Sequence, residues 1–157
     1  MTRITGIRWL AVGLVAVGAA MVAAPAAQAD PTGGMSVLTA VAGHGTGLVI
    51  VSPTSAGKGS FVAQVKVNIH DTAANTAFTV TRAIDPPDGN CTSTEFDPVA
   101  SLTTSAGGAG AVEFQRGVRG GGPASFDLRL QVISTDGTTV LQSDCMTIIG
   151  KAPLPAP

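Results

Sequence analysis

A strict alternation of apolar and polar residues over 61–70 constrains the fold of this chain more than any other feature. Apolar side chains occupy every odd position of this stretch, from Phe61 to Ile69, and polar side chains occupy the even positions from Gln64 to His70. A period of two places successive side chains on opposite faces of a β-strand. This segment therefore predicts a strand with one buried face.

A second alternating stretch predicts a second half-buried strand between residues 126 and 132. The side chains expected to face inward are Phe126, Leu128, Leu130 and Val132, and those expected to face outward are Asp127, Arg129 and Gln131.

Shorter runs that are apolar or rich in threonine predict five further strands, the last of them irregular near Asp144. These runs are 47–52, 76–84, 99–104, 111–116 and 138–149, and turn-forming sequences separate them at 57–59, 86–89, 107–110 and 136–137. About seven strands with regular punctuation and no helical period favour an all-β fold, an antiparallel β-sandwich. Residues 31–41 form either an ordered arm or a first edge strand.

The two alternating strands and their neighbours supply the expected core between two sheets. Its members all lie on apolar faces with a period of two: Val65, Val67, Phe78, Val80, Phe114, Leu128 and Leu130.

The N-terminal segment 1–29 has the pattern of a bacterial signal peptide. Two arginines precede a charge-free apolar run over 9–24, which Pro25 ends, and Ala27 and Ala29 are the small residues that signal peptidase requires before a cut at Asp30. A membrane anchor is the alternative, but a spanning helix needs about 20 apolar residues. We therefore expect a secreted protein with one domain over 30–151, a proline-rich tail over 152–157, and no membrane association after cleavage.

Composition excludes several classes of partner. The net charge is −1 and only 12% of residues are charged, so the chain lacks the basic stripe that nucleic acid requires. Tyrosine is absent and the single tryptophan, Trp9, lies in the predicted signal peptide. Binders of carbohydrate and of single-stranded nucleic acid use such aromatic platforms, so neither function is favoured.

The two cysteines, Cys91 and Cys145, predict a disulfide because the chain is expected to be exported and their number is even. A metal-binding or redox pair is the alternative, but neither cysteine has another cysteine or a histidine at ligand spacing.

No catalytic residue is predicted. Of the two histidines, His44 lies in a glycine-rich stretch that would position a base poorly, and His70 lies on the outward face of a strand. The two glutamates, Glu95 and Glu113, are each expected to be outward strand residues rather than a convergent acid pair.

No cofactor or metal site is predicted either, although two loops are candidates for binding. Asp85, Asp88 and Asn90 offer oxygen ligands suited to calcium, but they fit an ordinary turn equally well and miss the EF-hand spacing. The glycine-rich loop 117–123, flanked by Arg116 and Arg119, is a candidate binding loop, with a flexible connection as the alternative.

The segment from Asp71 to Val80 resembles a strand-connecting corner of immunoglobulin-like and fibronectin type III-like domains. In that corner a small residue, an asparagine or glycine, a threonine and an aromatic residue lead into a new strand, as Ala74, Asn75, Thr76 and Phe78 do here. With a cysteine following and an Ala-Gly turn later, the chain also resembles small secreted actinobacterial sandwiches, including the neocarzinostatin type. The resemblance implies an immunoglobulin-like sandwich and, for the neocarzinostatin type, a ligand in a cleft.

Two functions follow as expectations. The first is a non-enzymatic secreted sandwich that acts by interaction with an extracellular protein or surface component. The second is a small-ligand binder that uses a cleft near the disulfide, which would require an apolar pocket of about 300 Å³ or more.

Overall fold

The computed structural model describes residues 33–55, 60–119 and 125–150, and within these ranges it is all-β. The predicted signal peptide and the predicted C-terminal tail lie outside the described residues. The nine strands are β1 (Gly34–Ala40), β2 (Thr46–Ser55), β3 (Ser60–His70), β4 (Ala77–Asp85), β5 (Asp97–Thr103), β6 (Gly110–Arg119), β7 (Ser125–Ser134), β8 (Thr139–Ser143) and β9 (Met146–Ile149).

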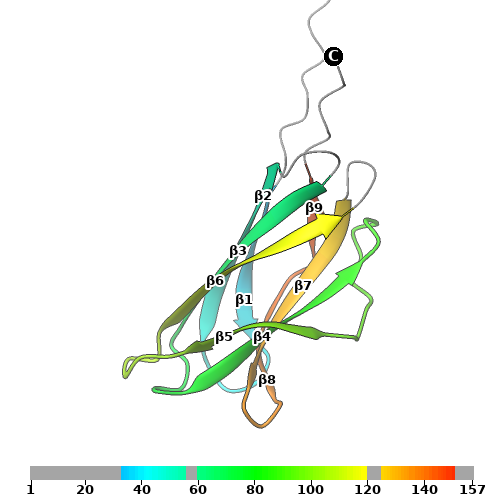
Figure 1. The fold of residues 1–157 in the computed structure, drawn as a ribbon. Helices are drawn as coiled ribbons and strands as arrows, with labels where there is room; N and C mark the ends of the chain where they lie inside the picture. The colour runs from blue at the N-terminus through cyan, green and yellow to red at the C-terminus, as the bar shows by residue number, and fades with distance from the viewer. Residues whose placement is uncertain (1–32, 56–59, 120–124, 151–157) are drawn as a thin grey trace, which may run out of the picture.

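The strands form one continuous antiparallel sheet in the order β5-β4-β7-β8-β1-β2-β3-β6, and β9 pairs with β7 beside β8. The sheet curls until its two edge strands approach each other, so that it nearly closes into a barrel (Figure 1). At this seam Arg116 of β6 donates a hydrogen bond from Nη2 to the carbonyl oxygen of Val99 on β5, at 3.1 Å. The all-β, antiparallel prediction is confirmed.

The inward positions of the strands form one apolar core. In β3 and β7 the predicted alternation is confirmed from Ala63 to Ile69 and from Leu128 to Val132, because these odd and even positions respectively are buried. Of the seven predicted core residues, six are buried, whereas Phe114 is only partly buried and packs against the core from β6.

Four predictions about the elements differ from the observed structure. The run 138–149 divides into β8 and β9 at the irregularity expected near Asp144. The N-terminal stretch, expected to be an arm or a first edge strand, is instead the interior strand β1, because it pairs with β2 on one side and with β8 on the other. The loop expected from residue 117 begins later, because β6 stays paired with β3 as far as the Arg119–Ser60 pair. Glu95 lies in the β4–β5 loop rather than on a strand.

The prediction that Asp127 faces solvent is wrong. Its side chain does lie on the outer face of β7, but it is 0% exposed because the β4–β5 loop, residues 86–96, folds over that face. Asp127 accepts hydrogen bonds from the Gly89 amide at 2.6 Å and from the Thr147 hydroxyl at 2.5 Å. The Thr147 hydroxyl is the main cause of a lowered pKa for Asp127, which burial opposes and the loop amides reinforce.

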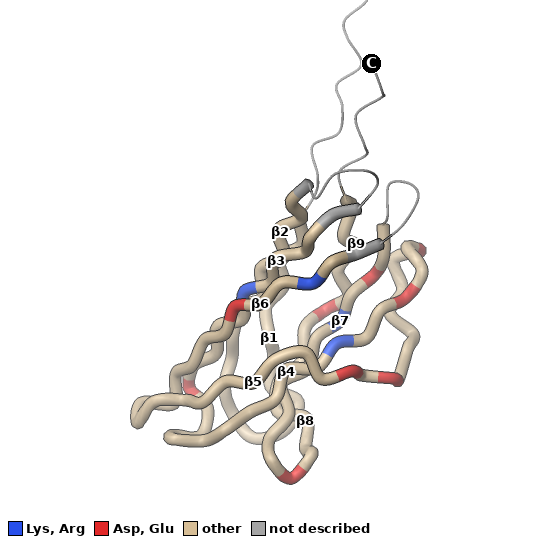
Figure 2. The backbone as a smooth tube through the Cα atoms, in the orientation of Figure 1, with Lys and Arg blue, Asp and Glu red and all other residues tan. Residues whose placement is uncertain are grey.

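Asp85 and Arg129 also hold the β4–β5 loop by hydrogen bonds. Asp85 is 6% exposed, and its Oδ1 accepts hydrogen bonds from the amides of Thr92, at 3.2 Å, and Ser93, at 2.8 Å. Arg129 donates to the Cys91 carbonyl at 2.7 Å. Acidic positions gather along the side of the molecule that carries this loop (Figure 2).

The predicted disulfide is confirmed. Cys91 of the β4–β5 loop is bonded to Cys145, between β8 and β9, with a Cα–Cα distance of 5.5 Å. The described residues contain no free cysteine. They also include no helix that is long and apolar enough to cross a membrane.

Candidate functional site

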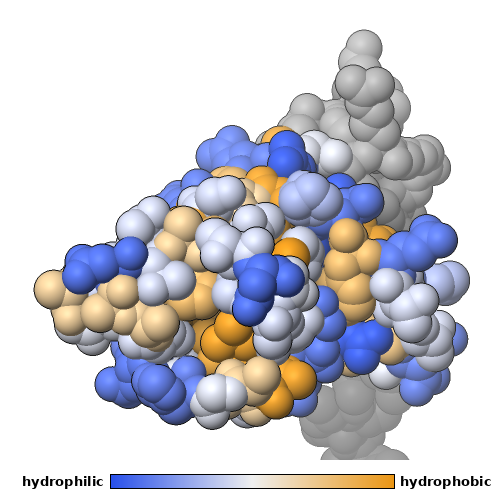
Figure 3. All heavy atoms as spheres, turned by 90° about the horizontal axis from the view of Figure 1, so that it is seen from below, coloured by the Kyte–Doolittle hydropathy of each residue, from blue (hydrophilic) through white to orange (hydrophobic). Residues whose placement is uncertain are grey.

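One concave site among the described residues is a pocket of about 260 Å³ at the end of the sheet where three chain connections meet. Seen from that end, apolar side chains lie at the bottom of a hollow that polar side chains surround (Figure 3). We call it the end pocket. Its lining residues are Ala42, Gly43 and His44 from the β1–β2 connection, Ala73 and Thr76 from the β3–β4 connection, Phe78 from β4, Ser134, Asp136 and Thr138 around the β7–β8 turn, and Val140 from β8.

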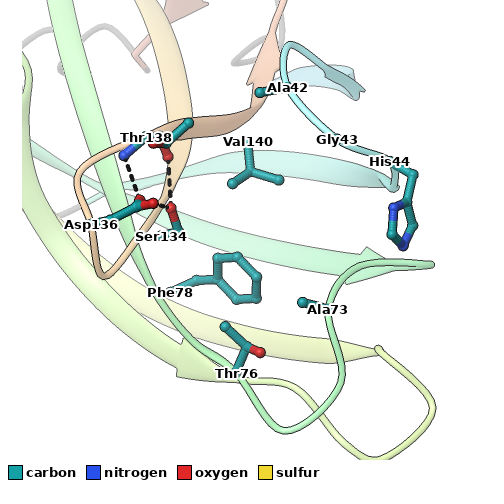
Figure 4. A pocket seen from close by; sticks show the side chains of 10 residues that line it. All are labelled: Ala42, Gly43, His44, Ala73, Thr76, Phe78, Ser134, Asp136, Thr138 and Val140. Atoms are coloured by element: carbon teal, nitrogen blue, oxygen red, sulfur yellow. Dashed lines mark hydrogen bonds between the residues drawn. The ribbon is translucent and has the colours of Figure 1, made fainter.

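The floor of the end pocket is apolar. Phe78 of β4 and Val140 of β8 point into it from the two sides of β7, and Ala73 lies at its edge (Figure 4). Phe78 is itself buried, so only a small part of its ring meets solvent, whereas Val140 is partly exposed. The pocket can therefore receive a small apolar group but offers no large aromatic surface.

Close packing between two connections fixes one side of the pocket. Gly45 has a φ of 125°, and a Cβ there would lie 2.5 Å from Cγ2 of Thr72 at the end of β3. Only glycine fits this conformation and this space. Gly45 therefore anchors the β1–β2 connection against the β3–β4 connection, and the exposed residues Gly43 and His44 just before it form this part of the pocket rim.

The β7–β8 turn supplies an ordered polar rim. Asp136 accepts hydrogen bonds from the Ser134 hydroxyl and from the Thr138 amide, the latter at 2.9 Å. These bonds, the Ser134 hydroxyl first, lower the pKa of Asp136. Because the carboxylate is committed to its own turn, it is held in place as an anionic edge rather than poised as a base.

The pocket does not contain a catalytic triad within the described residues. Ser134 donates its hydroxyl proton to Asp136 and not to an imidazole. His44 lies across the pocket from Asp136, with its ring at the opposite rim (Figure 4). Nucleophilic catalysis needs the base within hydrogen-bond reach of the nucleophile, so this arrangement favours binding.

The remaining titratable candidates lie apart from the pocket. His70 Nδ1 is 2.9 Å from Oδ2 of its neighbour Asp71, and both side chains are exposed. Glu113 is exposed on the outer face of β6, where it accepts a hydrogen bond from Gln64. Glu95 is exposed in the β4–β5 loop, so the two glutamates do not converge on one cleft of the described structure.

The three residues proposed as calcium ligands act within the β4–β5 loop. Asp85 binds loop amides, as described above, and Asp88 Oδ1 accepts a hydrogen bond from the Asn90 amide at 2.9 Å. Across the described ranges, no group of three or more histidine, cysteine, aspartate or glutamate side chains is arranged to hold a metal ion.

Of the two arginines that flank the candidate binding loop, the structure describes the side chain of only one. Arg116 lies on β6, bound to the Val99 carbonyl at the seam. The side chain of Arg119 and residues 120–124 of the loop lie outside the described residues.

Sequence reasoning missed the end pocket because its lining comes from three connections and three strands, which include segments far apart in the chain. The Asp136-Gly137 turn was the only local signal, and it indicated a hairpin rather than a site. The lining includes neither Cys91 nor Cys145, so the pocket is not formed by the disulfide. No family model matches the chain, and no curated protein matches it.

Proposed function

We propose that this protein is a secreted, non-enzymatic immunoglobulin-like β-sandwich that binds an extracellular protein or surface component. The end pocket carries the proposal, because its 260 Å³ lie below the range of about 300–1,000 Å³ that is typical of small-molecule sites. A pocket of this size with an apolar floor suits one apolar side chain of a partner, and the polar rim suits hydrogen bonds around it.

Secretion is supported by the signal-peptide pattern and by the disulfide, which persists in oxidising compartments. The sandwich assignment is supported by the packing of β4, β5 and β7 against β2, β3 and β6 around one core. N-terminal sequencing of the protein from culture medium should give Asp30 as its first residue.

A substitution that fills the end pocket tests the proposed interaction. The mature chain, residues 30–157, is cross-linked in culture, its partner is identified by mass spectrometry, and binding to that purified partner is measured. Ala73→Phe places a ring at the pocket edge and should weaken binding by about 10-fold or more. Ala111→Phe is the matched control, because Ala111 is an exposed alanine on β6 that does not line the pocket.

If Ala73→Phe binds the partner as tightly as the wild type does, the end pocket does not take part in the interaction. The second expected function, small-ligand binding in a cleft near the disulfide, predicts a different result. Native mass spectrometry of the secreted protein would then show a bound small molecule, and cross-linking would yield no partner.

A further inference from the structure

Two arginines occupy positions of the sheet whose alternation calls for apolar side chains. Arg82 of β4 pairs with the buried Leu130 of β7, and Arg116 of β6 pairs with the buried Ala63 of β3. Paired residues of adjacent antiparallel strands lie on the same face of the sheet. Both arginines are therefore on the inner face, approaching the core from the two sides of the seam.

Arg82 and Arg116 line one small cavity. Its volume is about 20 Å³, and the other lining residues are core residues of β3 and β7 together with Phe114 and Phe126. Both rings are only partly buried. The cavity is therefore apolar inside, cationic at its edge, and bordered by two aromatic surfaces.

The charges at this cavity are incompletely balanced. Burial and the neighbouring charge of Arg116 lower the pKa of Arg82, and Asp97 opposes them. Asp97 pairs with Arg82 across β4 and β5 but forms no ion pair with it within 4.0 Å among the described contacts. Two cations thus share the edge of an apolar cavity with one more distant carboxylate.

The Nε atom of Arg82 adds an independent observation. Four buried side-chain polar atoms have no hydrogen-bond partner among the described residues: Thr81 Oγ1, Arg82 Nε, Asp85 Oδ2 and Arg129 Nε. Thr81, Asp85 and Arg129 lie on the outer face of the sheet, where Asp85 and Arg129 also bind the β4–β5 loop. Arg82 Nε is a donor alone on the inner face, and a buried donor without an acceptor is rare in proteins.

We propose that Arg82 and Arg116 bind the carboxylate of a small amphiphilic acid whose apolar group lies against Phe114 and Phe126. A carboxylate accepts hydrogen bonds from arginine in a fixed geometry and offsets the repulsion between two guanidinium groups. The closed cavity admits about one small group. Most of the ligand's apolar group therefore lies against the partly exposed rings of Phe114 and Phe126. Because these two rings offer a small apolar surface, we expect the ligand to be a small acid.

The test uses phenylacetate as the probe and the ¹⁵N-labelled mature chain, with spectra that include the arginine Nε–H signals. Phenylacetate should give saturable shifts at Arg82 Nε–H and at amides of β3, β6 and β7. Acetate lacks the apolar group and 2-phenylethanol lacks the carboxylate, so each should bind at least about 10-fold more weakly. Equal binding of acetate, or no saturable response to phenylacetate at about 10 mM, would overturn the proposal.

Matched variants separate binding from a purely structural role. Arg82→Gln and Arg116→Gln should each raise the Kd for phenylacetate by about 10-fold or more. Lys66→Gln removes an exposed charge on the outer face of β3 and should leave the Kd unchanged. A charge that points inward on an edge strand also protects a sheet from aggregation, and Arg116 lies on the edge strand β6 whereas Arg82 lies on the interior strand β4. If the arginines have only structural roles, Arg116→Gln will aggregate more readily than the wild type and phenylacetate will bind to none of the proteins.

Arg82 is more buried than Arg116, so Arg82→Gln can fail to fold. Arg116→Gln keeps the test decisive in that case. The Arg116 side chain is exposed and donates one hydrogen bond across the seam, so its replacement should lower the melting temperature only slightly and leave the protein folded. A folded Arg116→Gln protein that binds phenylacetate as the wild type does would refute the proposed site.

Discussion

Reduction of the Cys91–Cys145 disulfide should lower the free energy of unfolding by about 4 kcal/mol. The bond joins cysteines separated by 54 residues. Closing a loop of that length removes about 14 cal/mol/K of entropy from the unfolded chain. The free energy of the folded state should change little on reduction, because Asp85, Asp127 and Arg129 hold the β4–β5 loop by hydrogen bonds of their own.

The expected change in melting temperature follows from the size of the domain. Each kcal/mol corresponds to about 4 °C for a domain of somewhat more than 100 residues, so reduction should lower the melting temperature by about 16 °C. Circular dichroism melts with and without a phosphine reductant measure this difference. The Cys91→Ala/Cys145→Ala variant should melt with the reduced wild type and should not respond to the reductant.

A difference of less than about 4 °C between the oxidised and reduced proteins would refute this reasoning. It would mean that the unfolded chain is already restricted, or that the bond strains the native loop by nearly as much as it restricts the unfolded one. Alkylation of two thiols in the native secreted protein would contradict the bond itself.

Three further predictions concern the core, pH and a turn. Leu130→Ala should cost about 2–5 kcal/mol in urea unfolding, whereas Gln131→Ala should cost about 1 kcal/mol or less; equal costs would contradict the strand register. Because the folded pKa of Asp127 lies below its unfolded value of about 3.9, its stabilisation is complete above that pH and is lost as the pH falls through the folded pKa. Urea unfolding between pH 6 and pH 2 should show this loss, and Asp127→Asn should reduce the pH dependence. Gly108→Ala should destabilise more than Gly137→Ala: both glycines have positive φ, but only at Gly108 would a Cβ meet a backbone oxygen, at 2.2 Å. Thermal melts that rank the two variants in the opposite order would contradict the close approach.

The sequence by itself determined the all-β class and the apolar face of β3 and of the second half of β7. The alternation from Ala63 to Ile69 was sufficient, because a period of two is a property of the extended backbone and does not depend on distant residues. The disulfide was also predictable, since a chain with two cysteines has only one internal pairing available.

Only the tertiary structure decided what covers each face. Asp127 lies on the outer face that its position in β7 predicts, yet it is fully buried because the β4–β5 loop, about 40 residues earlier in the chain, folds over it. In the same way, the end pocket and the pair Arg82 and Arg116 exist because the sheet curls and brings distant strands together. Local alternation specifies the direction of a side chain relative to its own strand, whereas its surroundings depend on long-range packing that no local pattern records.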